Sequence, residues 1–115
     1  MNKINEYLNK YRKTGTYSNG EPFEMNRPRL WCKDGYSVSV QASRWHYCTP
    51  RIDGASEYDS VELGFPNMVD DLIYDYAEDC DDLTKTVYGY VPVYIVNELI
   101  EKHGGIDESM IGKRV

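Results

Sequence analysis

Residues 34 and 35 form an Asp-Gly pair between two runs of β-favouring residues, 29–32 and 36–42. Glycine adopts positive φ at little steric cost, so Asp-Gly between such runs is a strong signal for a β-hairpin. In the second run apolar side chains alternate with polar ones: Tyr36, Val38, Val40 and Ala42 against Ser37, Ser39, Gln41 and Ser43. This period of two predicts a strand with one face in the core and one polar face, in an antiparallel sheet.

Helical spacing predicts a helix near each end of the chain and one between them. Asn67 is placed to cap a helix over 68–76, where acids crowd the first turn. Pro92 suits the first turn of a final helix that stops at Gly104 and Gly105. The first helix is expected over 3–12, where the apolar residues at helical spacing are Ile4, Tyr7, Leu8 and Tyr11.

Two further β-favouring stretches, 58–63 and 86–90, complete the expected set of elements. The order helix, three strands, helix, strand, helix predicts an α+β fold with a small, mostly antiparallel sheet of about four strands and two or three helices. At 115 residues the chain is expected to be a single domain over 1–115. Glycines and prolines predict a loop or arm over 13–28, and residues 106–115 are expected to form a tail.

The chain has no apolar run as long as a membrane span, and its start lacks the apolar segment of a signal peptide. We therefore expect a soluble, cytoplasmic protein. Its three cysteines, an odd number, fit reduced thiols better than a disulfide framework. Cys32, Cys48 and Cys80 are expected to be small buried hydrophobes.

Charge is distributed unevenly along a chain whose net charge is −6. Five basic residues and one acid between positions 27 and 51 give that segment a local charge of +4. The segment from 70 to 82 holds seven acids and no lysine or arginine. Such asymmetry bears on partners and association rates rather than on fold. The overall negative charge disfavours binding to extended duplex nucleic acid.

The segment 41–51 concentrates residue types that bind ligands. Arginine offers a planar set of donors to carboxylate or phosphate, and aromatic rings offer flat faces for a base. These types predict a site for an anionic, partly aromatic ligand, although no glycine-rich phosphate loop accompanies them. The predicted ligand-binding residues are Gln41, Ser43, Arg44, Trp45, His46, Tyr47, Thr49 and Arg51.

That site requires Arg44 and Arg51 to converge on one open hollow, with Trp45 or Tyr47 in its wall. The structural alternative has equal weight: Trp45 and Tyr47 pack in the core while the two arginines pair with the acidic segment.

The acidic segment admits a second kind of site. A row of carboxylates can occupy a groove that another protein uses for nucleic acid, and Asp70, Asp71 and Asp75 are the predicted partner-binding residues. A solvated face is the more ordinary interpretation. The spacing of the acids does not match the EF-hand calcium loop, which also needs a central glycine.

Catalytic and metal chemistry has little support in the residue spacing. Zinc would draw on Cys32, His46 and Cys48 with Cys80 or His103, but the chain has no CxxC or HExxH motif. A nucleophilic enzyme would pair Cys48 or Cys32 with a histidine, and His46 with His103 is a conceivable acid/base pair. We predict no catalytic residue, no metal site and no cofactor.

Four stretches, WCKDGYSVSVQAS (31–43), HYCTPR (46–51), VELGFP (61–66) and VYGYVPV (87–93), resemble small proteins carried by phages and prophages of gut bacteria. The likeness covers most of the chain beyond Leu30 and brings no assigned activity or site residues. It implies a context, because small phage accessory proteins often counter host defences by binding a nuclease or by sequestering a signalling nucleotide.

The first functional expectation is therefore a non-enzymatic binding protein that sequesters an anionic small molecule, such as a defence signalling nucleotide. The alternative is an inhibitor that presents an acidic, Tyr-rich surface to a host nuclease or defence protein. A small hydrolase or nuclease around His46 and Cys48 is the third. The expected partners are an anionic small molecule or a host protein, with no membrane, and the sequence leaves a homo-oligomer open.

Overall fold

A computed structural model describes residues 2–112 and contains the predicted hairpin. Strands β3 (Leu30–Trp31) and β4 (Ser37–Gln41) are antiparallel, with Leu30 opposite Val38. Gly35 has a φ of +95°, and the Asp34 carboxylate accepts the Tyr36 N–H at 2.9 Å. The Asp-Gly pair therefore makes the turn that its residue types predict.

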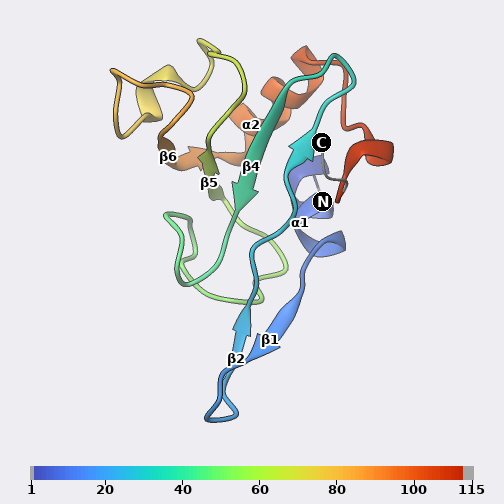
Figure 1. Cartoon of the computed structure of the whole chain (residues 1–115), viewed down its shortest axis with the longest axis vertical. Helices are drawn as coiled ribbons and strands as arrows, with labels where there is room; N and C mark the ends of the chain where they lie inside the picture. The colour runs from blue at the N-terminus through green and yellow to red at the C-terminus, as the bar shows by residue number, and fades with distance from the viewer. Residues whose placement is uncertain (1, 113–115) are drawn as a thin grey trace.

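The hairpin extends into a four-stranded antiparallel sheet in the order β3-β4-β5-β6 (Figure 1). Strand β5 is Ser60–Gly64 and β6 is Val87–Pro92, with an irregularity in their pairing between Val61 and Leu63. The predicted α+β class with about four strands is confirmed.

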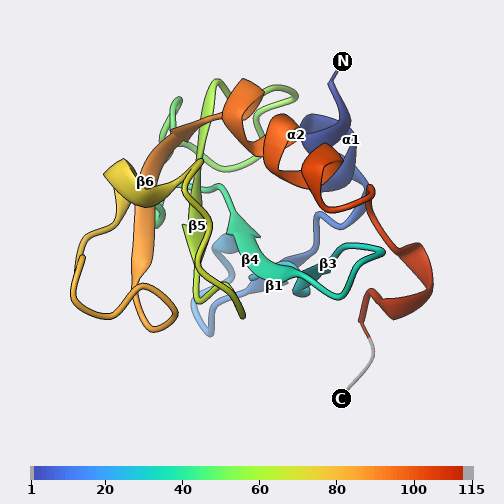
Figure 2. The same cartoon turned by 90° about the horizontal axis from the view of Figure 1, so that it is seen from above.

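Two α-helices cover one face of this sheet (Figure 2). Helix α1 is Lys3–Lys10 and α2 is Val93–Lys102, and the Ile4 N–H donates to the Asn97 side chain at 3.1 Å between them. Helix α2 ends at Lys102, and Gly104 and Gly105 follow its cap residue His103, both with a φ of +91°. The whole apolar row predicted for residues 36–42 is buried in the core beneath the helices, namely Tyr36, Val38, Val40 and Ala42.

The segment predicted as a loop or arm, 13–28, contains a two-stranded hairpin of β1 (Thr14–Thr16) and β2 (Pro22–Glu24). It projects from the rest of the chain (Figure 1). The Phe23 ring lies against Gly15, where an added Cβ would be 2.7 Å from it, and Gly20 turns the chain with a φ of +89°. The glycines that suggested a loop thus serve the hairpin: Gly15 allows the Phe23 ring to pack closely, and Gly20 allows the tight turn.

The predicted helix over 68–76 is wrong. Only a 3-10 turn, η1 (Tyr74–Tyr76), forms there. Asn67 does not cap a helix: its side chain accepts the Ser37 N–H at 2.9 Å and donates to the Gly35 carbonyl at 2.9 Å. The residue that suggested a helix start instead ties this segment to the β3–β4 turn.

The C-terminal segment is tied to the edge of the sheet. The Asp107 N–H donates to the Trp31 carbonyl at 2.8 Å, and a 3-10 turn, η2 (Glu108–Met110), follows. The last part of the predicted tail, 113–115, lies outside the described residues. No helix within residues 2–112 has both the length and the apolar character needed to cross a membrane.

All three thiols are unpaired. Cys32 and Cys48 are buried as expected, whereas Cys80 is exposed, so the prediction of a third buried hydrophobe is wrong.

Candidate functional site

The polar row of β4 serves the fold rather than an open site. Gln41 is buried, and its amide accepts the Arg27 N–H at 2.8 Å and donates to the Arg27 carbonyl at 2.9 Å. Ser43 is also buried, and its hydroxyl lies 2.7 Å from His46 Nδ1. Both predicted ligand-binding side chains therefore have internal partners.

Arg44 and Trp45 lie together at the start of the exposed loop after β4. Trp45 is 61% exposed, so it does not pack in the core. The Arg44 guanidinium lies 5.2 Å from the Trp45 ring centre, and its Nε is 3.5 Å from the Asp53 carboxylate. Arg44 also lines a small hollow with Asp53, Arg12 and Glu24. Its charge is thus shared with neighbouring acids.

Arg51 and Tyr47 form a separate pair. The Arg51 guanidinium lies 5.2 Å from the Tyr47 ring centre, and its Nε donates to the Arg44 carbonyl at 3.1 Å. Tyr47 lines a different hollow from Arg44, one shared with Tyr76 and Tyr90. The two guanidiniums lie over different rings, and this is not the convergence on which the predicted site depended.

His46 and Cys48 bond to other groups and not to each other within residues 2–112. Burial lowers the pKa of His46 and raises the pKa of the Cys48 thiol, which disfavours a reactive thiolate. The Cys48 sulfur contacts the carbonyl oxygens of Ser43 at 3.2 Å and Pro50 at 3.5 Å.

Thr49, another of the predicted ligand-binding residues, is exposed, and its Oγ1 accepts a hydrogen bond from the Ser60 hydroxyl at 3.0 Å.

The three acids predicted to bind a partner separate into two groups. Asp71 and Asp75 are exposed, but Asp70 is only 6% exposed. The Asp70 carboxylate lies 2.8 Å from His103 Nε2 and 3.1 Å from the Lys102 ammonium. Asp70 therefore belongs to an internal network at the end of α2 and not to an open acidic surface.

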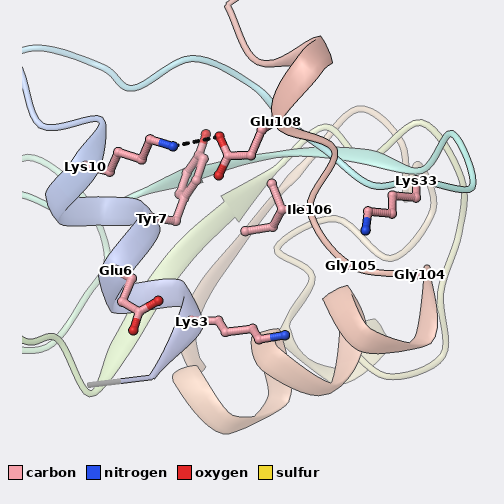
Figure 3. Close-up of a pocket in the computed structure, with 9 residues that line it drawn as sticks. All are labelled: Lys3, Glu6, Tyr7, Lys10, Lys33, Gly104, Gly105, Ile106 and Glu108. Carbon is pink, nitrogen blue, oxygen red and sulfur yellow. Dashed lines mark ion pairs between the residues drawn. The ribbon is translucent and has the colours of Figure 1, made fainter.

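A hollow of about 450 Å³ lies between α1 and the segment after α2 (Figure 3), and we call it the lysine hollow. It brings Lys33 together with Lys3 and Lys10 of α1, with Tyr7 and Ile106 in its wall. The lining residues are Lys3, Glu6, Tyr7, Lys10, Lys33, Gly104, Gly105, Ile106 and Glu108.

The backbone around the turn of β3–β4 shapes the far wall of the lysine hollow. The Lys33 N–H donates to the Gly105 carbonyl at 3.0 Å, so the turn and the end of α2 are held together. A Cβ on Gly104 would lie 3.4 Å from the Lys33 Cβ, whereas a Cβ on Gly105 would meet open space. The pair of glycines keeps this wall free of side chains.

Charge within the lysine hollow is only partly compensated. Lys10 pairs with Glu108 at 3.1 Å, and this hydrogen bond raises the pKa of Lys10. Lys3 and Lys33 form no ion pair within residues 2–112. Figure 3 shows Lys3 and Lys33 entering the hollow from opposite sides, with Glu6 beside the stem of Lys3. Three lysines and two glutamates thus line one hollow of an acidic protein, and of the three lysines Lys10 alone has an ion-pair partner within residues 2–112.

Sequence reasoning missed this site because its lysines come from two separate segments. Lys3 and Lys10 lie on α1, and Lys33 lies in the turn before β4. No local motif links them, and only the packing of α1 against α2 and of the turn against Gly105 brings them together. The one signal in the sequence is that Lys33 immediately precedes the predicted Asp-Gly turn.

Within residues 2–112, no group of three or more His, Cys, Asp or Glu side chains is arranged to hold a metal ion. Comparisons of the chain with protein-family models, curated proteins and solved structures return no match. The site is therefore interpreted from its own geometry.

Proposed function

We propose that this protein is a non-enzymatic binding protein that holds a small anionic molecule in the lysine hollow. The observation that carries the proposal is the approach of the unpaired Lys3 and Lys33 ammonium groups to one space. The class of ligand is the one predicted from the sequence, but the proposed position differs from the 41–51 segment. There, Arg44 shares its charge with Asp53, and Arg51 bonds to a backbone carbonyl.

The lining favours a ligand that carries two singly charged anionic groups or one group with two negative charges. Each ammonium offers three donors, and two ammonium groups on opposite sides can hold separate anionic oxygens. The Tyr7 ring and Ile106 add apolar surface, and the volume lies in the range of small-molecule sites.

The resemblance to phage-carried proteins adds one suggestion about the ligand. Sequestration of a signalling nucleotide would need a site for phosphate and a surface for a base. The lysine hollow offers both, through its ammonium groups and through Tyr7 and Ile106. A nucleotide is therefore the first compound class to test, beside inorganic pyrophosphate.

Pyrophosphate and a panel of mono- and cyclic dinucleotides are expected to raise the melting temperature in a concentration-dependent manner. Replacing Lys3 or Lys33 with methionine removes one charge and keeps much of the apolar stem. Each change is expected to weaken binding about tenfold, the equivalent of one charge-assisted hydrogen bond. Isothermal titration calorimetry measures the loss, and affinity should fall as salt rises.

The matched control is Lys85→Met, since Lys85 is exposed and does not line the lysine hollow. An equal loss in that variant would mean a general charge effect and would contradict the proposal. Arg51→Ala locates the site: if it abolishes binding while the Lys3 and Lys33 variants bind normally, the ligand lies at the 41–51 segment instead. Absence of any stabilisation by the whole panel also rejects the proposal.

A further inference from the structure

A second hollow, of about 270 Å³, has the opposite character to the lysine hollow and lies beside β6. Its walls are mostly aromatic, and its single charged member is a carboxylate. The lining residues are Tyr47, Tyr76, Ala77, Glu78, Gly89 and Tyr90, and we call this set the tyrosine cage. We infer that the tyrosine cage binds a cationic side chain, an arginine above all, presented by a partner protein.

Three backbone contacts hold the walls of the tyrosine cage. The Tyr90 N–H donates to the Tyr47 carbonyl at 3.0 Å, which joins β6 to the loop after β4. Ala77 forms a β-bridge with Tyr88, and the Glu78 N–H donates to the Val87 carbonyl at 3.0 Å. The tyrosine cage is therefore assembled from three separate segments, one of which is β6, the edge strand of the sheet.

The rings of Tyr47 and Tyr90 are close but not stacked. Their centres are 5.8 Å apart and their planes are inclined by 36°. Gly89 makes the arrangement possible, because a Cβ there would lie 3.2 Å from the Tyr47 Cβ. The two rings thus form a splayed wall, and a flat group can lie against an open ring face.

Tyr90 has an unusual backbone for an exposed aromatic residue. Its φ is +53°, in the left-handed region that bulky residues avoid, and its side chain is 50% exposed. Burial of the ring therefore offsets little of the strain. Strained residues of this kind concentrate at binding sites, where the backbone holds a side chain in position for a ligand.

The chemistry of the tyrosine cage selects a cation. The Arg51 guanidinium already lies 5.2 Å from the centre of the Tyr47 ring, although Arg51 does not line the tyrosine cage. Glu78 is exposed and has no ion pair among the described residues. Lys85 is the only basic residue between positions 70 and 92, and Asp79, Asp81 and Asp82 follow Glu78. The carboxylates around Glu78 favour a cation over an anion here.

An arginine fits these features better than a lysine does. A planar guanidinium can stack on a tyrosine face and at the same time donate two hydrogen bonds to a carboxylate. The remaining acids nearby favour a partner with a basic surface around that arginine. This inference is independent of the lysine hollow, because the two sites share no lining residue.

The test is an NMR titration of the full chain with the peptide acetyl-Gly-Arg-Gly-amide. The same peptide with citrulline in place of arginine is the matched probe, since citrulline keeps the shape and loses the charge. The arginine peptide is expected to shift the resonances of Tyr47, Tyr76 and Tyr90 in a saturable manner. The citrulline peptide should bind at least fivefold more weakly, in keeping with the size of a cation–π contact.

Variants of Tyr90 and Glu78 test the walls. Tyr90→Phe keeps the ring and should bind within about twofold of the original chain, whereas Tyr90→Leu should lose about fivefold or more. Glu78→Gln should lose about threefold through the missing carboxylate, and this loss should shrink at high salt. Because Tyr90→Leu can disturb the strained backbone, the amide spectrum of each variant is compared with that of the original chain.

Tyr94→Leu is the control, since Tyr94 is 63% exposed on α2 and does not line the tyrosine cage. Equal weakening by Tyr94→Leu would show that any exposed tyrosine contributes, and the inference would be lost. It is also overturned if the citrulline peptide binds as well as the arginine peptide. The same holds if an acetyl-Gly-Glu-Gly-amide peptide binds more tightly, or if no peptide shifts the cage resonances at tens of millimolar.

Discussion

Replacing Arg27 with methionine is expected to lower the free energy of unfolding by about 3–5 kcal/mol, the usual cost of breaking a buried ion pair. The Arg27 side chain is 1% exposed, and its Nη2 donates to the Glu24 carboxylate at 2.7 Å. Its Nε donates to the Leu8 carbonyl at 2.9 Å and its Nη1 to the Ala42 carbonyl at 2.9 Å. The substitution removes one donor from each of three buried acceptors, and a buried acceptor without its donor lowers the stability of the folded state.

The second partner of this network limits the loss. Glu24 also accepts from Arg12 Nε at 2.9 Å and from the Gly54 N–H at 2.7 Å, so its carboxylate keeps two donors. The double variant Arg27→Met, Glu24→Gln removes both charges of the buried pair. It should therefore be more stable than the sum of the two single losses predicts, with a coupling of about 1–3 kcal/mol.

Urea denaturation followed by circular dichroism measures these losses, and an unchanged m-value shows that two-state unfolding is retained. Lys13→Met is the control, since Lys13 is exposed and belongs to the same connecting region. It should change the free energy of unfolding by less than about 0.5 kcal/mol. A loss below about 1 kcal/mol for Arg27→Met would show that the buried pair has little part in stability.

Arg27 also shows that the basic segment found by counting charges does not lie wholly at the surface. Charge counting treated five basic residues between positions 27 and 51 as one group. Arg27 is buried against Glu24, and Arg29 donates to the Ser37 hydroxyl at 2.8 Å and to the Phe65 carbonyl. The count is right, but tertiary packing decides which charges face the solvent, and counting along the chain cannot show this.

Signals that act over a few residues predicted the fold best. The Asp34-Gly35 turn and the end of α2 before Gly104 depend on backbone conformations that glycine adopts easily, and both are confirmed. The expected helix over 68–76 depended on Asn67 as its cap, and Asn67 bonds to the β3–β4 turn instead. Here a tertiary contact competed with a local preference and won.

The hollows in the surface are less predictable from the sequence than the strands and helices are. Tyr47 lies in the 41–51 segment that the sequence singled out, and it does line a hollow, but Tyr76 and Tyr90 come from other segments. The lysine hollow unites α1, a turn and the residues after α2. Sites assembled from distant segments have no spacing pattern in the sequence, so composition can suggest a ligand class without giving its position.

Replacing His103 with alanine is expected to lower the free energy of unfolding by about 2–3 kcal/mol at neutral pH, because the imidazole loses its hydrogen bonds to two carboxylates. His103 Nδ1 lies 2.6 Å from Asp34, and Nε2 lies 2.8 Å from the buried Asp70. The imidazole ring also stacks on Tyr36, with centres 4.0 Å apart. Asp70 retains only Lys102 and the Leu72 N–H as donors after the change.

The same contacts give a pH dependence whose sign is determined by the two carboxylates. Hydrogen bonds from the Tyr36 N–H and from His103 lower the pKa of Asp34. Burial acts to raise the pKa of Asp70, but hydrogen bonds from Leu72, His103 and Lys102 outweigh it and the net direction is down. The unfolded chain then binds more protons than the folded chain in acid. This stabilisation is complete above the unfolded aspartate pKa of about 3.9 and is lost as pH falls through the lower folded values.

Acid unfolding therefore separates the role of His103 from simple packing. His103→Ala should unfold with a shallower dependence on pH below about 4, because the carboxylates lose a donor that lowers their pKa. Lys102→Met is the matched control: Lys102 contacts the same Asp70, but its side chain is 52% exposed, so its loss should stay below about 1 kcal/mol. If both variants lose stability equally, or if His103→Ala keeps the original slope in acid, then His103 stabilises the fold through its stack on Tyr36 and not through the two aspartates.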